Sequence, residues 1–135
     1  MDTGKSALGL DGNVAAALGY PIGIIAIICL IMEKENRFVK FHALQSLLWI
    51  ALYIVVVIAL MILGVIIGIL GIAASSASSS AGAGVGLIGM LVWLIWLVVF
   101  FGWLIMLILA AVKAYGGVLY KLPIVGNMAE KFANK

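Results

Sequence analysis

The side chains best suited to chemistry lie close together at one point of the chain. His42, Gln45 and Ser46 share one face of a predicted helix, and Trp49 and Tyr53 continue that face at helical spacing. These polar groups could hydrogen-bond to a neighbouring helix or to the C-terminal tail, form a proton or substrate relay at a channel mouth, or contact lipid headgroups. Because His42 is the only histidine and the helix carries no carboxylate, a relay would have few groups to carry protons. Hydrogen bonding is therefore the favoured interpretation.

A short cluster of charges precedes this polar face. It contains Glu33, Lys34, Glu35, Arg37 and Lys40, in a segment too short to be a domain. The pattern is typical of a loop or interfacial turn that leads into the next helix. Its charges are expected either to face solvent and headgroups or to form a docking site for a partner protein.

The sequence lacks the residues that several kinds of chemistry require. The sequence has no phosphate-binding glycine loop, no His-Glu-x-x-His motif and no cysteine pair, since Cys29 is the only cysteine. The five acidic residues all lie outside the apolar runs, which argues against a carboxylate-based ion pump. We therefore expect no catalytic residues, no metal site, no cofactor and no enzymatic activity. The eight basic residues form no dense tract, so nucleic acid is not an expected partner.

Apolar runs must position the polar face. Between Lys40 and Lys113 the chain has no Asp, Glu, Lys or Arg, and 67% of all its residues are hydrophobic against 10% charged. A soluble domain of this size could not bury so much apolar surface, so lipid is the expected solvent. The predicted fold is all-α, an integral membrane protein with three transmembrane helices and a short amphipathic C-terminal helix.

The predicted boundaries follow from the same runs. We expect one membrane domain over residues 1–135, with spans at about 13–32, 43–73 and 87–115, a flexible Ser/Gly loop at 74–86 and an interfacial tail at 116–135. Pro21 should kink the first span. Helix packing is expected at Gly19 and Gly23 and at the pair Gly64 and Gly68, whose four-residue spacing lets helices approach closely.

Basic residues predict the orientation. With three spans, Lys5 is alone on one side, and seven basic residues share the other: Lys34, Arg37, Lys40, Lys113, Lys121, Lys131 and Lys135. Positively charged segments stay in the cytoplasm. The sequence therefore predicts a multi-pass protein of the cytoplasmic membrane, with the N-terminus outside and the C-terminus inside.

Two segments carry a resemblance to a known family. Residues 33–46, with the pattern Phe-x-x-Phe-His-x-x-Gln-Ser, and residues 120–131 resemble small prokaryotic membrane proteins of unknown function. That family is related to the Tic-twenty-like component of the chloroplast import translocon. The resemblance implies an α-helical membrane protein and, for the plastid relatives, a role in protein translocation. It makes the motif positions candidate interaction residues: Glu33, Arg37, Phe38, Phe41, His42, Gln45, Ser46, Lys121, Pro123 and Glu130.

The leading hypothesis from the sequence is a non-enzymatic structural or interaction protein. Its cytoplasmic-face motif would dock onto its own tail, lipid headgroups or a partner. The alternative is a translocation or channel component formed by oligomers, and a small-solute transporter is the weakest candidate. Expected partners are membrane lipids and either a second copy of the chain or another membrane protein.

Overall fold

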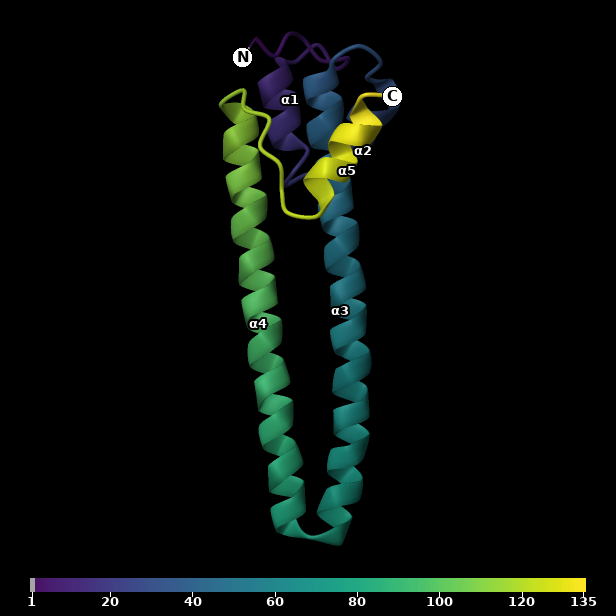
Figure 1. Cartoon of the computed structure of the whole chain (residues 1–135), viewed down its shortest axis with the longest axis vertical. Helices are drawn as coiled ribbons and strands as arrows, with labels where there is room; N and C mark the ends of the chain where they lie inside the picture. Colours follow the sequence, from purple (N-terminus) through teal and green to yellow (C-terminus); the bar gives the residue numbers. More distant parts are fainter. Residues whose placement is uncertain (1) are drawn as a thin grey trace. The chain divides into compact units, whose positions relative to one another are not determined.

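The computed structural model describes residues 2–135, which form five α-helices. These are α1 (Gly12–Leu18), α2 (Gly23–Met32), α3 (Arg37–Ala77), α4 (Ser79–Tyr115) and α5 (Val125–Ala133) (Figure 1). The all-helical class predicted from the sequence is confirmed. The contacts divide the chain into two compact units. We call residues 2–52 with 104–135 the charged unit and residues 53–103 the apolar unit.

The apolar unit consists of the second part of α3 and the first part of α4. Residues 53–77 and 79–103 each give about 37 Å of helix, enough to cross the ~30 Å hydrocarbon core of a bilayer. In residues 2–135, α3 and α4 are the two helices long and apolar enough to span a membrane. Within the most apolar window of α3 no residue is buried, unlike the core helix of a soluble protein. These apolar faces therefore suit a lipid solvent.

Aromatic side chains join the two helices inside the apolar unit. Tyr53 of α3 stacks on Trp103 of α4 with ring centroids 4.5 Å apart, and Trp96 stacks on Phe100 at 5.7 Å. Trp96, Phe100 and Trp103 follow one another along α4 at four- and three-residue spacing. Ring packing therefore accounts for these three side chains of α4.

The expected flexible loop at 74–86 is helical except at Ser78, so that prediction is wrong. The hydroxyls of Ser75 and Ser76 donate to the carbonyl oxygens of Gly71 and Ile72, four residues earlier. The Ser78 hydroxyl accepts the Ala81 N–H at 3.1 Å, the bond expected of a helix N-cap. Local serine bonding thus shortens the connection to a tight turn.

Gly64 and Gly68 do not pack against another helix within the described residues. A Cβ placed on either glycine would meet no atom within 4 Å. Both instead line a groove of about 740 Å³ between α3 and α4 of the apolar unit. The predicted packing role is not seen for this pair. Gly19 does make close contact, because a Cβ there would lie 3.3 Å from Ala26 Cβ, and Gly23 lies against Ile50.

The first predicted span is two short helices instead of one kinked helix. α1 ends at Leu18 and α2 begins at Gly23, because Pro21 has no N–H to donate and its ring obstructs the preceding turn. The two helices fold against each other, and Ala15, Ala26 and Cys29 pack with Val39 and Ala43 of α3 in one apolar cluster. Ten residues of α2 measure about 15 Å, half the thickness of a hydrocarbon core.

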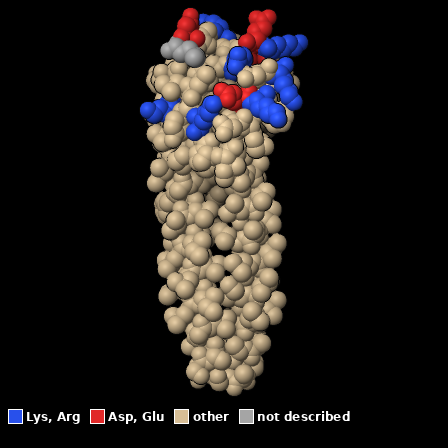
Figure 2. All heavy atoms as spheres, in the orientation of Figure 1, with Lys and Arg blue, Asp and Glu red and all other residues tan. Residues whose placement is uncertain are grey.

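The charged unit carries every acidic and basic side chain of the chain. Figure 2 shows these charges gathered over residues of that unit. Its last element, α5, begins at Val125 and is the short C-terminal helix predicted from the tail. α5 buries Val125, Ala129 and Ala133, and Phe41 of α3 packs against the last two.

Candidate functional site

The polar face of α3 begins with an N-cap. The Asn36 side-chain oxygen accepts the N–H groups of Phe38 and Val39 at 3.1 and 3.2 Å, which fixes where the helix starts. His42 and Gln45 then lie three residues apart on the side that faces the interior of the charged unit. Both are fully buried. Buried polar groups need partners, so the geometry around them defines the site.

Gln45 uses all of its hydrogen-bonding groups except one acceptor lone pair. Its Nε2 donates to the Tyr20 hydroxyl at 2.7 Å and to the Tyr120 carbonyl at 2.9 Å. Its Oε1 accepts the Leu122 N–H at 2.9 Å. One amide on α3 therefore binds both the turn after α1 and the extended segment that leads to α5.

His42 extends this network, and each of its two ring nitrogens has a fixed role as donor or acceptor. The Val118 carbonyl can only accept, so His42 Nε2 carries the hydrogen and donates at 3.1 Å. His42 Nδ1 is then an acceptor and receives the Tyr20 hydroxyl hydrogen at 2.9 Å. The Tyr20 oxygen also accepts a hydrogen bond from Gln45. The hydrogen bonds therefore run from Gln45 to Tyr20, from Tyr20 to His42 and from His42 to Val118, and each donor has one acceptor. The imidazole is held in a single neutral tautomer.

The tail fits this network because Gly126 has no side chain. A Cβ on Gly126 would lie 2.6 Å from Lys121 Cβ and 3.0 Å from Gln45 Oε1. The preceding Ile124 has φ +69°, the only positive φ of a non-glycine residue among residues 2–135. This backbone conformation is strained for a β-branched residue. The surrounding contacts must therefore hold the turn that brings α5 back onto α3.

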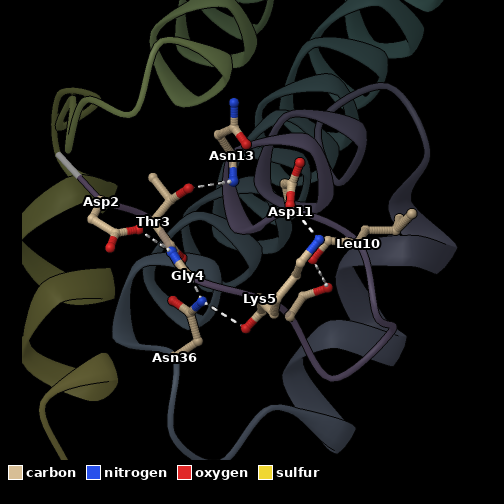
Figure 3. Close-up of polar contacts among 9 residues, drawn as sticks. Asp2, Thr3, Gly4, Lys5, Leu10, Asp11, Asn13 and Asn36 are labelled. Carbon is tan, nitrogen blue, oxygen red and sulfur yellow. Dashed lines mark hydrogen bonds and ion pairs between the residues drawn. The ribbon is translucent and has the colours of Figure 1, made fainter.

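A second set of contacts joins the N-terminal arm to the segment 33–36. The Ala7 N–H donates to Glu33 Oε2 at 2.7 Å, and Asn36 Nδ2 donates to the carbonyls of Thr3 and Lys5 at 2.7 and 3.1 Å. Figure 3 shows the contacts of Asn36 with the arm. Asn13 also donates to the Tyr115 carbonyl at 2.8 Å.

These contacts bear on the predicted number of spans. The three-span prediction placed the N-terminal arm and the 33–42 segment on opposite sides of the membrane. In the structure the two segments are hydrogen-bonded to each other, and the run 13–32 forms two short helices instead of one long span, so the three-span prediction is not confirmed. The physical reason is the break at Pro21, which allows α2 to fold back beside α1.

Most residues of the predicted interaction motif point inward. Glu33, Phe38, Phe41, His42, Gln45 and Ser46 are buried. Arg37 and Pro123 are exposed, and Lys121 forms an ion pair with Glu130 at 2.7 Å on the surface of the charged unit. The structure brings the whole motif together in the charged unit. It does not bring Gly64 or Gly68 to this site.

Sequence reasoning missed four residues that complete the site. Tyr20, Asn36, Leu122 and Gly126 were not among the predicted site residues. A tyrosine next to Pro21 inside an apolar run was an available signal for Tyr20, because its hydroxyl needs a partner there. Asn36, directly before the helix, was an available cap signal.

The network is built to hold structure. Among residues 2–135, no buried side-chain nitrogen or oxygen lacks a partner, and no group of three or more His, Cys, Asp or Glu is placed to hold a metal ion. The favoured interpretation has His42 and Gln45 bonding to a neighbouring helix or to the tail, and the observed partners are the tail and Tyr20 of the turn after α1. The arrangement can fix the tail and the N-terminal helices on α3.

The fold and the site together define a small α-helical membrane protein with an internal, structural polar network. The model of the magnetosome magnetite crystal formation protein family matches residues 7–129, and the chain belongs to this family.

Curated relatives support the same class. The chain is 33% identical to a UPF0132 membrane protein of Methanocaldococcus jannaschii over 146 aligned positions, which cover 96% of each chain. It is 38% identical to a UPF0132 membrane protein of Archaeoglobus fulgidus, with 88% of this chain and 92% of the relative covered. No solved structure matches the chain. The expectation of a small prokaryotic membrane protein family is therefore confirmed.

Proposed function

We propose that the protein is a non-enzymatic structural or interaction component of the cytoplasmic membrane, anchored by α3 and α4. One observation carries this proposal: all charged residues belong to the charged unit, and residues 53–103 contain none. A segment without charge is stable in hydrocarbon, whereas the charged unit requires water or headgroups. The single membrane domain expected from the sequence remains part of this proposal.

The orientation follows from the same distribution. The charged unit carries all eight basic side chains, and the turn at Ser78 has no charge near it. Under the positive-inside rule the charged unit, with both chain ends, lies in the cytoplasm, and the Ser78 turn lies outside. This two-span arrangement agrees with the contacts between the N-terminal arm and residues 33–36.

The docking surface lies outside the buried network. Because His42 and Gln45 are used internally, their role is to fix the tail on α3. A partner would contact the exposed charges of the surrounding segment, such as Lys34, Glu35 and Lys131. The expected partner is a second copy of this chain or another membrane protein.

Cysteine labelling tests the anchoring. Single-cysteine variants Asp2→Cys, Lys34→Cys and Ser80→Cys, each made with Cys29→Ser, would be treated in whole cells with a membrane-impermeant maleimide. We expect labelling at position 80 only, and labelling at positions 2 and 34 after permeabilisation. Labelling of position 2 without permeabilisation would contradict the two-span arrangement.

Site-specific crosslinking tests the interaction role. A photoreactive residue at Lys34 should yield one defined adduct, and the matched position Ser80 should not. The charge reversal Lys34→Glu should remove a partner that co-purifies in mild detergent. Absence of any adduct at position 34 and at Lys131 would argue against the interaction role.

A translocation or channel component, as the Tic-twenty-like resemblance implies, is the second candidate. The observation that favours it is the groove of about 740 Å³ in the apolar unit, lined by Gly64, Gly68, Gly86 and Ser75 among others. An oligomer that joined such grooves would conduct ions. Purified protein in a planar bilayer should then show single-channel currents, and a silent bilayer at high protein load would exclude this candidate.

A further inference from the structure

A second pocket of the charged unit lies beside the buried network. It has a volume of about 280 Å³, between the start of α3, residues 119–121 and the end of α5. Its polar walls include Arg37, Lys121 and Glu130, and its apolar walls include Phe38, Phe41 and Leu119. The pocket therefore combines charge and hydrocarbon at one place.

The polar wall carries excess positive charge. The ion pairs within residues 2–135 are Lys5 with Asp11 and Lys121 with Glu130, so Arg37 is not neutralised by either. The Lys121 ammonium has three donors and gives one to Glu130 at 2.7 Å. The guanidinium of Arg37 offers a planar fork that matches the oxygens of a phosphate or carboxylate.

The start of α3 adds to this potential. Its first turn has no acidic residue and contains Arg37, and Lys40 follows directly. The N-terminus of a helix is already its positive end, so a cation at this position opposes the helix dipole. An anion bound at Arg37 would relieve this opposition.

The apolar wall is held in place. The rings of Phe38 and Phe41 contact His42 edge-on, with centroids 4.6 and 5.0 Å apart, and both side chains are buried. Leu119 is 43% exposed and forms an apolar rim. A ligand that carries hydrocarbon next to its anionic group would cover this rim.

We propose that this pocket binds the phosphate group of an anionic amphiphile. Arg37 and Lys121 would hold the phosphate oxygens, and the adjoining hydrocarbon would lie against Leu119 and the two phenylalanines. The phosphate can come from a membrane phospholipid or from a soluble phosphate compound. This inference concerns a ligand, and it stands whether or not the protein has the partner suggested above.

Binding measurements on the purified full chain test the site. Dihexanoyl phosphatidylglycerol, dihexanoyl phosphatidylcholine and inorganic phosphate would be titrated in mild detergent by calorimetry. We expect the phosphatidylglycerol to bind about ten-fold more tightly than the zwitterionic lipid, because the choline cation of the latter offsets its phosphate charge and is repelled by Arg37 and Lys121. Arg37→Gln and Lys121→Gln should each weaken binding about ten-fold, the loss expected when a charge-assisted bond is removed.

Lys131→Gln is the matched control, since Lys131 is an exposed cation of α5 that does not line the pocket. It should leave the affinity unchanged. If inorganic phosphate binds as tightly as the lipid and Arg37→Gln weakens both equally, the phosphate contacts are supported and the role of the apolar wall is overturned. Lipid binding that ignores headgroup charge, or that falls equally in Lys131→Gln and Arg37→Gln, would overturn the proposal. Because Arg37 is exposed, its variant should keep the thermal stability of the wild type.

Discussion

The charged unit and the apolar unit solve the problem of solvation in opposite ways. The charged unit buries its polar network, in which His42 and Gln45 have 0% exposure. The apolar unit exposes large hydrocarbon side chains, with Ile72 at 75% and Val98 at 73%. In water the second arrangement would be unfavourable, and in lipid it is the ordinary one. The difference teaches that hydrogen bonding specifies the charged unit, whereas the surrounding solvent specifies the apolar unit.

The glycines of the two units show the same contrast. Gly126 of the charged unit is surrounded so closely that a Cβ would overlap Lys121. Gly64 of the apolar unit has open space where its Cβ would be. The same residue type thus allows a close approach within the chain in one unit, and leaves a smooth helix surface in the other.

Removal of the Gln45 amide should produce the largest loss of thermal stability. Gln45→Leu leaves the Leu122 N–H, the Tyr120 carbonyl and the Tyr20 hydroxyl without this partner, at a cost of about 3 kcal/mol or more. The thermal unfolding midpoint can be followed in mild detergent with a thiol-reactive dye, because the buried Cys29 becomes accessible when the charged unit opens.

Ser46→Ala is the matched control for this measurement. Ser46 is buried to nearly the same extent, and its hydroxyl donates to the Ala43 carbonyl of its own helix instead of to a distant segment. We expect less than about 1 kcal/mol from its loss. Equal destabilisation by the two variants would show that the network does not specify the charged unit.

A methyl group on Gly126 should have the next largest effect. Gly126→Ala places carbon within 2.8 Å of Lys121 Cα, and the backbone cannot yield cheaply. We expect about 2 kcal/mol of destabilisation in the same thermal assay, within the usual range for overpacking.

Gly64→Ala is the counterpart in the apolar unit and should not destabilise the protein, because alanine has the higher helix propensity. If Gly64→Ala instead weakens an oligomer seen by native mass spectrometry, the smooth helix surface is a contact between copies.

Loss of the Tyr20 hydroxyl should have a smaller effect. Tyr20→Phe removes the donor to His42 and the acceptor for Gln45, although the ring remains buried. We expect about 1–2 kcal/mol of destabilisation, since two buried partners each lose one bond. Tyr53→Phe, in the stacked ring of the apolar unit, should leave the unfolding temperature unchanged. If Tyr53→Phe lowered the unfolding temperature more than Tyr20→Phe, a tyrosine hydroxyl would matter more in the apolar unit than in the charged unit, which would contradict the comparison.

The surface ion pair should matter least. Lys5 and Asp11 are 72% and 61% exposed, and their atoms lie 2.6 Å apart. Exposed pairs of this kind contribute about 0–1 kcal/mol and are screened by salt. Asp11→Asn should therefore shift the unfolding midpoint little at low salt and not at all at high salt. A large shift would mean that the N-terminal arm depends on this pair more than on Asn36.

Local patterns predicted part of the site and missed the rest for identifiable reasons. Helical spacing placed His42 and Gln45 on one face, and the tail was recognised as a candidate partner. Tyr20 was missed because it lies 22 residues from His42 and inside a run interpreted as a membrane span. The segment 74–86 was misassigned because composition favours a linker, whereas the hydroxyls of Ser75 and Ser76 are satisfied within the helix itself.

The sequence by itself determined that one part of the protein suits lipid and the other suits water or headgroups. The charge-free stretch between Lys40 and Lys113 fixed this, because the cost of transferring a charge into lipid depends on the residue and its depth more than on the fold. Only the tertiary structure decided that residues 13–32 fold back and that the motif around His42 faces inward. Both outcomes depend on hydrogen bonds between residues far apart in the chain, which spacing along the sequence does not reveal.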